Sequence, residues 1–187
     1  MADAKTTTEC TSVLKRVVAV LTTILTLLLG QAGTSQAQPS PEAVHNAGDV
    51  NISGDVHNPL AFTPDSLRAL TSRTESVTFH TASGMQSHSY LGAPVDTLLA
   101  AAQPLLIPGA KHPDITLAVL ATGADGYSVT LSWAEVSPAL APRPALVAWS
   151  EDEVPLSEAR LVLPDDLTGA RYVSALTDLR VIQLAAH

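Results

Sequence analysis

Cysteine is almost absent from this chain of 187 residues, which contains only Cys10. A single cysteine forms no intramolecular disulfide. Cys10 also precedes the apolar run Val17–Leu29, whereas the lipid-modified cysteine of a lipoprotein would follow it. The fold is therefore expected to depend on its hydrophobic core.

Aromatic residues are also scarce, at 4% of the chain, so the core must consist mainly of Leu, Val, Ile and Ala. Basic residues number 10 against 18 acidic ones, and no basic cluster occurs. This balance disfavours nucleic acid and anionic lipid as partners. Hydrophobic residues make up 46% and charged residues 15%, a composition typical of a globular domain.

The N-terminal segment, residues 1–37, has the three zones of a secretory signal peptide. Lys15 and Arg16 precede the apolar run Val17–Leu29, and Ser35-Gln36-Ala37 fits the small-x-small cleavage rule, which predicts a cut after Ala37. The alternative is a membrane anchor, but thirteen residues fall short of the roughly 20 that a spanning helix needs. Residues 38–48 are interpreted as a linker and 49–187 as one domain, located in the periplasm or secreted.

The domain is predicted to be α+β, with a mixed β-sheet and short helices. A capped helix is expected from Thr63 to about Ser72, a second from Pro94 and a third at Ser132, where Glu135 completes a capping box. The polar stretch 84–92 is interpreted as a loop. Seven strands are expected, near residues 50–56, 76–81, 114–121, 127–131, 145–149, 161–163 and 176–184.

Motifs of the common catalytic classes do not occur in the sequence. It has no GxSxG elbow, no GxxxxGK[ST] phosphate loop, no GxGxxG and no HExxH. His80 and His88 could approach each other across the loop, but no carboxylate has metal-ligand spacing to them, so they are interpreted as surface histidines. No catalytic residue and no metal ligand is predicted.

Three blocks of the chain, in order, carry a family resemblance. They are GDVHNP at 54–59 with the helix that follows it, TGADGY at 122–127, and RLVLP at 160–164 running on to GARYV at 169–173. Together they resemble the molybdopterin-binding domain of the sulfite oxidase family. The resemblance covers nearly all of residues 49–187 and implies the sulfite-oxidase-type molybdopterin-binding fold.

The resemblance also implies where a cofactor would bind. In the family a cysteine thiolate ligates molybdenum at the end of a strand, at the position of His80 or Thr81 here, and a lysine that holds the cofactor phosphate is replaced by Ser174. Tyr127 matches the tyrosine beside the metal, and two arginines match family arginines near the pocket. The candidate cofactor-binding residues are therefore Thr81, Asp125, Tyr127, Arg160, Arg171 and Ser174.

Two functions follow from these departures. The first is an exported, non-catalytic binding or accessory module that has lost the molybdenum ligand, binds no cofactor and takes an unknown small ligand or an exported protein partner. The alternative is a periplasmic oxidoreductase that holds molybdopterin through its pterin and phosphate only. A structural partner for an exported enzyme is a third hypothesis. No nucleic-acid partner is expected, and no membrane contact after signal cleavage.

Overall fold

The structure, a computed structural model, describes residues 48–184. The predicted signal peptide and all but the last residue of the predicted linker lie outside these residues, so both stay predictions. No helix within residues 48–184 is long and apolar enough to span a bilayer. The elements are β1 (Val50–Gly54), β2 (Leu60–Phe62), α2 (Pro64–Arg68), β3 (Arg73–Thr81), β4 (Gly84–Pro94), α3 (Val95–Ala102), β5 (Leu117–Gly123), β6 (Ser128–Ser132), α4 (Trp133–Val136), β7 (Leu146–Glu151), β8 (Val154–Val162), the short 3₁₀ helix η1 (Gly169–Arg171) and β9 (Leu176–Gln183).

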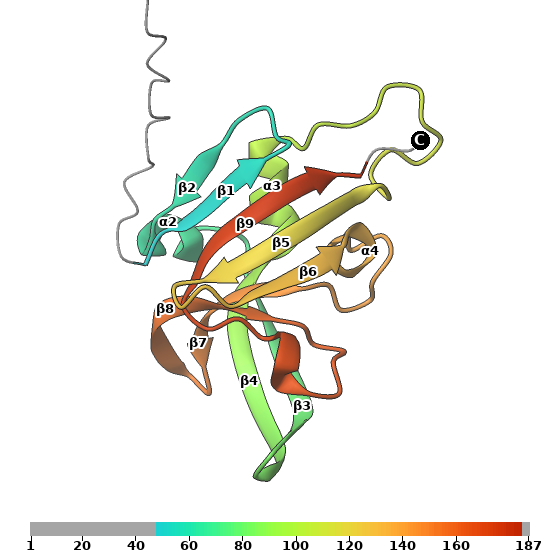
Figure 1. Ribbon diagram of the computed structural model, residues 1–187. Coiled ribbons are helices and arrows are strands. Elements are labelled where there is room, and N and C mark those ends of the chain that lie inside the picture. The colour runs from blue at the N-terminus through green and yellow to red at the C-terminus, as the bar shows by residue number, and fades with distance from the viewer. Residues whose placement is uncertain (1–47, 185–187) are drawn as a thin grey trace, which may run out of the picture. The chain divides into compact units, whose positions relative to one another are not determined.

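The strands form two sheets (Figure 1). The first has the order β2-β1-β9-β5-β6, with β1 and β9 parallel and the other neighbours antiparallel. The second, β3-β4-β7-β8, is antiparallel throughout. The prediction of an α+β domain with mixed pairing and short helices is confirmed.

Local sequence explains where several elements begin. Thr63 accepts a hydrogen bond from the Ser66 amide at 3.3 Å, which caps α2, although this helix ends at Arg68 rather than near Ser72. The Ser132 amide donates to Glu135 Oε2 at 2.9 Å, which is the bond that the predicted capping box requires of Glu135, and the Ser132 hydroxyl donates to the same oxygen at 2.9 Å. The β5–β6 turn uses Gly126 with φ of 81°, a conformation that favours glycine.

The main core is aliphatic, as the composition predicts, and it joins α3 to residues of both sheets. Its fully buried members include Ile52, Leu98, Leu99, Val147 and Leu161. A second cluster, formed by Val77, Phe79, Tyr90, Leu146, Ala148 and Val162, belongs to the β3-β4-β7-β8 sheet. This second cluster contains two of the domain's few aromatic residues, Phe79 and Tyr90, and both line the site described below.

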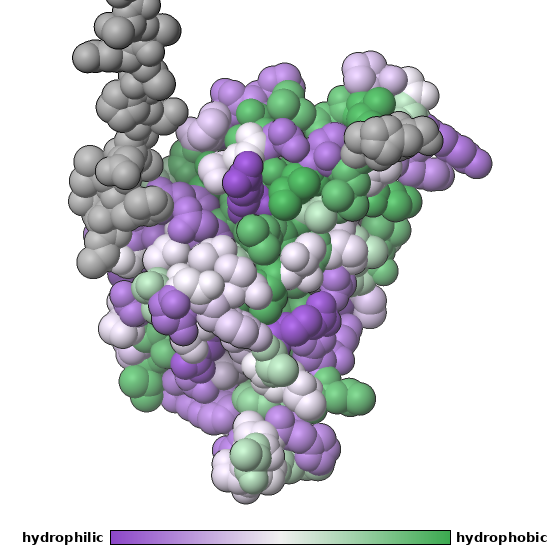
Figure 2. Space-filling model, in the orientation of Figure 1, coloured by the Kyte–Doolittle hydropathy of each residue, from purple (hydrophilic) through white to green (hydrophobic). Residues whose placement is uncertain are grey.

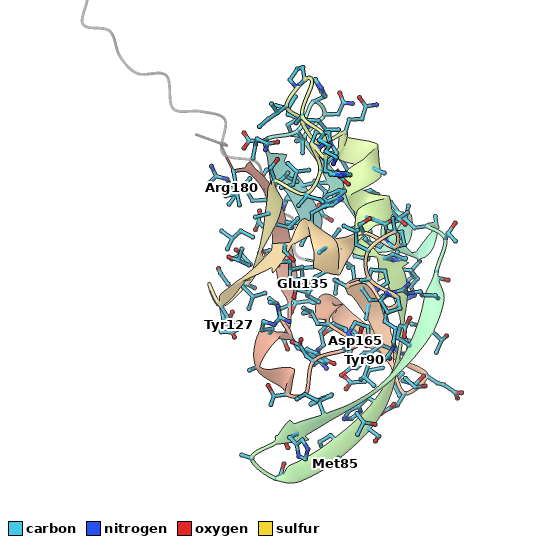
Figure 3. All side chains as sticks on the ribbon, turned by 90° about the vertical axis from the view of Figure 1, so that its right-hand side faces the viewer. Met85, Tyr90, Tyr127, Glu135, Asp165 and Arg180 are labelled. Atoms are coloured by element: carbon cyan, nitrogen blue, oxygen red, sulfur yellow. The ribbon has the colours of Figure 1, made fainter. Side chains whose placement is uncertain are left out.

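The interpretation of residues 84–92 as a loop was wrong, because they form most of β4. The β3–β4 hairpin extends away from the other elements, with Met85 near its tip (Figures 1 and 3). The tip half of β4 is largely exposed, so its residues are polar and show little of the alternation that marks a half-buried strand. Strand β2 was also missed, because a strand of three residues carries too short a pattern.

Candidate functional site

The site predicted from the sequence falls in part on one open cavity of about 430 Å³. It lies against β3, β4 and β8 and is called here the hairpin cavity. Paired residues of antiparallel strands project to the same face, so Phe79 and Gln86 stand together, as do Tyr90 and Glu151. The lining residues are Phe79, Thr81, Ser83, Gln86, His88, Tyr90, Glu151, Arg160, Gly169, Tyr172 and Ser174.

Glu151 is the centre of a charge network in this cavity. Its Oε1 accepts a hydrogen bond from the Tyr90 hydroxyl at 2.7 Å, and its Oε2 accepts one from Arg160 Nη1 at 2.6 Å. Nδ1 of His88 lies 3.2 Å from Glu151 Oε1 and 2.8 Å from Asp152 Oδ2. The Arg160 guanidinium is therefore neutralised by a carboxylate of the same chain.

The network shifts two pKa values in opposite directions. Burial, and then the hydrogen bond to Glu151, raise the pKa of the Tyr90 phenol, so it remains a neutral donor. Hydrogen bonds from the Ser89 amide and from His88 lower the pKa of the Asp152 carboxyl below its usual value. The first shift favours the neutral phenol of Tyr90, which donates a hydrogen bond, and the second favours the ionised carboxylate of Asp152, which accepts them.

Aromatic rings form the floor of the hairpin cavity. The centroid of Phe79 lies 4.9 Å from that of Tyr172 and 5.8 Å from that of His88. Burial, and then the charge of Asp166, raise the pKa of the Tyr172 phenol to about 12. Gly169 lies so close to Phe79 that an added Cβ would stand 3.0 Å from its ring. The floor thus consists of aromatic rings, with the backbone of Gly169 packed against Phe79.

Three of the six candidate residues, Thr81, Arg160 and Ser174, line the hairpin cavity together. The Thr81 hydroxyl donates to the Gly84 carbonyl oxygen at 3.0 Å and accepts from the Ser83 amide at 3.2 Å. These bonds belong to the β3–β4 turn, so the hydroxyl already has partners. The end of β3 that the resemblance selected does lie at a cavity, but the Thr81 hydroxyl there already takes part in hydrogen bonds of the turn.

Arg171 lies apart from these three, in a separate hollow of about 290 Å³. Its Nε and Nη2 donate to the two oxygens of Asp166 at 3.0 and 2.5 Å, and its Nη1 donates to Glu135 at 2.5 Å. The hydrogen bonds to Asp166, and then those to Glu135, raise the pKa of the guanidinium above its ordinary value. Arg171 therefore ties α4 to the segment around η1.

Asp125 and Tyr127 have local roles in the β5–β6 turn. Asp125 Oδ1 accepts the Tyr127 amide at 2.9 Å, which closes the turn. The Tyr127 hydroxyl donates to the Ala170 carbonyl oxygen, although its side chain is largely exposed. In Figure 3 Tyr127 lies on the opposite side of the η1 segment from Met85 and the hairpin tip. Neither residue lines the hairpin cavity.

Several residues of this cavity escaped the sequence analysis. His88 was interpreted as a surface histidine, yet only 25% of its side chain is exposed and it pairs with Asp152. Glu151, which also lines the cavity, and its neighbour Asp152 were not among the candidate residues. Asp152 lies 64 residues along the chain from its partner His88 and 63 residues from its partner Ser89, so no local sequence signal could reveal either contact. Within residues 48–184, no group of three His, Cys, Asp or Glu side chains is placed to hold a metal ion.

No protein-family model matches the chain, and no curated protein matches its sequence. Among solved structures, the chain is similar to the sulfane dehydrogenase SoxCD from Paracoccus pantotrophus, with a TM-score of 0.59 and 20% sequence identity. The match covers 72% of this chain and 38% of that one. The chain thus spans well under half of its structural neighbour, and the likeness establishes the predicted fold.

Proposed function

We propose that this protein is an exported, non-catalytic binding module that keeps a sulfite-oxidase-type fold without its molybdenum cofactor. The observation that carries the proposal is the neutralised state of Arg160, whose guanidinium lies 2.6 Å from Glu151 in the hairpin cavity. A cofactor phosphate needs uncommitted cations. Arg171, the other candidate arginine, is occupied in the same way by Asp166 and Glu135.

The donor set of the hairpin cavity does not fit a molybdenum cofactor. No thiol occurs within residues 48–184, and the oxygen of Thr81 is committed to the hairpin turn. A dianionic phosphate placed beside Arg160 would also stand near Glu151 and Asp152, which repel it. Two features support the proposal. Arg160 is neutralised by Glu151 where the cofactor would need a free cation, and the described residues contain no thiol to bind molybdenum.

The same cavity suits an uncharged polar ligand. Its walls offer the hydroxyl group of Ser174 and the amide of Gln86, and its floor offers aromatic rings. Hydroxyl and amide groups both donate and accept hydrogen bonds, so they match a ligand that carries no net charge. The balanced pair of Arg160 and Glu151 adds a donor and an acceptor without adding net charge.

Export is part of the proposal and rests on residues 1–37, which lie outside the described residues. The apolar run Val17–Leu29 and the small residues before the predicted cut after Ala37 support it. The intact mass of the protein from the exported fraction is expected to correspond to a chain that begins at Gln38. A mass that retains residues 1–37 would instead support the membrane anchor.

A phosphate titration tests whether the cavity lacks a free cation. Inorganic phosphate, standing in for the cofactor phosphate, is added to the wild type and to Glu151→Gln while amide NMR shifts are followed at Gln86, Gly169 and Ser174. The wild type should show no saturable shift. Glu151→Gln releases Arg160 and should show a saturable shift. Saturable binding by the wild type would contradict the proposal.

A further inference from the structure

One edge of the Arg160 guanidinium is left free by the charge network of the hairpin cavity. Within residues 48–184, Arg160 donates through Nη1 alone, to Glu151 Oε2 at 2.6 Å and to the Tyr90 hydroxyl at 3.3 Å. The N–H groups of Nε and Nη2 therefore have no acceptor among the described residues. These two nitrogens form the edge of a guanidinium that pairs with a carboxylate through two parallel hydrogen bonds.

The free edge of Arg160 is open to a ligand. Its nitrogens are not among the shielded side-chain atoms that lack a hydrogen-bond partner in residues 48–184. The Arg160 side chain is 26% exposed and lines the hairpin cavity. The cavity volume of about 430 Å³ lies in the usual range for small-molecule sites, roughly 300–1,000 Å³. The charge of Arg160 is thus balanced by Glu151, whereas part of its hydrogen-bonding capacity is unused.

Charge decides which carboxylate the cavity would take. Among the lining residues, the Arg, Lys, Asp and Glu side chains are those of Arg160 and Glu151, so the fixed charges cancel. A ligand with a carboxylate alone would add an unbalanced negative charge beside Glu151, as a phosphate would. A ligand that also carries an ammonium group keeps the balance, because the ammonium pairs with Glu151 while the carboxylate pairs with Arg160.

The spacing of the two charged side chains restricts the ligand further. Arg160 Nη1 lies 2.6 Å from Glu151 Oε2, so the two opposite charges stand side by side. A ligand meets both at once when its own opposite charges are equally close. An α-amino acid has this arrangement, because its carboxylate and its ammonium are attached to the same carbon atom.

We propose that the hairpin cavity binds a free α-amino acid with an uncharged side chain. The carboxylate accepts from Nε and Nη2 of Arg160, the ammonium donates to Glu151, and the side chain lies towards the rings of Phe79 and Tyr172. Figure 2 shows hydrophobic surface mainly over the β5–β6 region towards α4 and less of it at the hairpin tip, which suits a polar ligand at the hairpin. The proposal rests on the function proposed above, because it names the ligand of the same cavity.

The test uses L-leucine and its isomer 6-aminohexanoate, which also has no net charge but carries its two charged groups at opposite ends. Each is titrated into the protein at pH 7 while amide NMR shifts are followed at Gln86, Gly169 and Ser174. L-leucine should shift these signals saturably, with a Kd at least about tenfold below that of the isomer, the effect of one hydrogen bond to a charged group. 4-Methylpentanoate, which lacks the ammonium, and 3-methylbutylamine, which lacks the carboxylate, should also bind more weakly than L-leucine.

Variants identify the residue responsible. Arg160→Lys keeps a positive charge beside Glu151 but loses the edge formed by Nε and Nη2, so the Kd for L-leucine should rise at least about tenfold. Arg68→Lys is the matched control, since Arg68 lies in α2 outside the cavity lining, and it should leave the Kd unchanged. If Arg160→Lys does not fold, Ser174→Phe fills the cavity from an exposed position and should abolish binding.

Three results would overturn the proposal. The first is equal affinity for L-leucine and 6-aminohexanoate, which would leave no role for the spacing of the charges. The second is saturable binding that neither Arg160→Lys nor Ser174→Phe weakens, which would place the ligand elsewhere. The third is the absence of any saturable shift up to the solubility of L-leucine. These results leave the proposed function standing, whereas saturable phosphate binding by the wild type would contradict that function itself.

Discussion

The hairpin cavity and a cavity of about 370 Å³ that Asp96 of α3 and Trp133 of α4 line, called here the α3–α4 cavity, contain the same kinds of group in opposite states. In the first, Glu151 has three partners in His88, Tyr90 and Arg160. In the second, Asp96 has a shielded oxygen with no partner in the described chain. A satisfied network stabilises the fold and discourages charged ligands, whereas an unsatisfied polar group costs stability. The difference predicts how each cavity responds to mutation.

The largest effect is expected from Arg160→Met in the hairpin cavity. This change leaves Glu151, whose side chain is only 21% exposed, without its cationic partner. The free energy of unfolding should fall by about 2 kcal/mol, the usual value for a hydrogen bond to a charged group. Urea denaturation measures it. Adding Glu151→Gln should recover part of the loss, and a loss below about 0.5 kcal/mol would show that the network contributes little.

A smaller loss is expected from Tyr90→Phe, because the change removes a single neutral donor. The ring stays in the second cluster, while the 2.7 Å hydrogen bond to Glu151 disappears. The free energy of unfolding should fall by about 1.5 kcal/mol, the lower end of the range for a hydrogen bond to a charged group, because Glu151 keeps Arg160 as its partner. Thermal and urea denaturation should agree on this value. An unchanged stability would mean that water replaces the hydroxyl without cost.

Asp96→Asn in the α3–α4 cavity should change stability by less than about 0.5 kcal/mol. It removes a poorly solvated carboxyl, which favours the variant, and a negative charge in the first turn of α3, which favours the wild type. The two effects oppose each other. A loss as large as that of Arg160→Met, measured in the same urea series, would show that Asp96 has a structural partner after all.

The smallest predicted effect, for which only a direction is given, is a pH dependence of opposite sign in the two regions. Burial raises the pKa of Asp96, so its protonation favours the folded state, and this contribution is lost as pH rises through the folded pKa. The pKa of Asp152 is lowered, so its contribution is present above the unfolded pKa and is lost as pH falls through the folded one.

The measurement compares urea denaturation at pH 7 and pH 4. On acidification, the stability of the wild type relative to Asp96→Asn should rise, and relative to Asp152→Asn it should fall. Asn tolerates the positive φ of 51° at position 152, so the second variant keeps its backbone. Parallel pH profiles for the two variants would contradict the contrast between the regions.

Much of the fold could be predicted from the sequence because its signals are local. The cap at Thr63, the capping box of Ser132 and Glu135 and the Asp125–Gly126 turn each lie within a few residues. The hairpin strand β4 could not be predicted, since its exposed half needs no apolar alternation. Strands that lie mainly in solvent are therefore recognised by their pairing rather than by their pattern.

The site was only partly predictable, because its chemistry depends on distant pairs. The resemblance brought Thr81, Arg160 and Ser174 to one cavity, but it could not show that Arg160 meets Glu151. It also joined Arg171 to this group, whereas Arg171 binds Asp166 in another hollow. Whether an arginine is free or neutralised is set by tertiary contacts, so no sequence motif reports it.

The most direct test of the central claim is the molybdenum and pterin content of the protein. The mature chain would be purified from the exported fraction of a host that makes the cofactor, with metal analysis and oxidised-pterin fluorescence read on the same folded sample. The neutralised arginines and the missing thiol predict neither molybdenum nor pterin above background. Near-stoichiometric amounts of both would contradict the account and would favour a cofactor-dependent oxidoreductase.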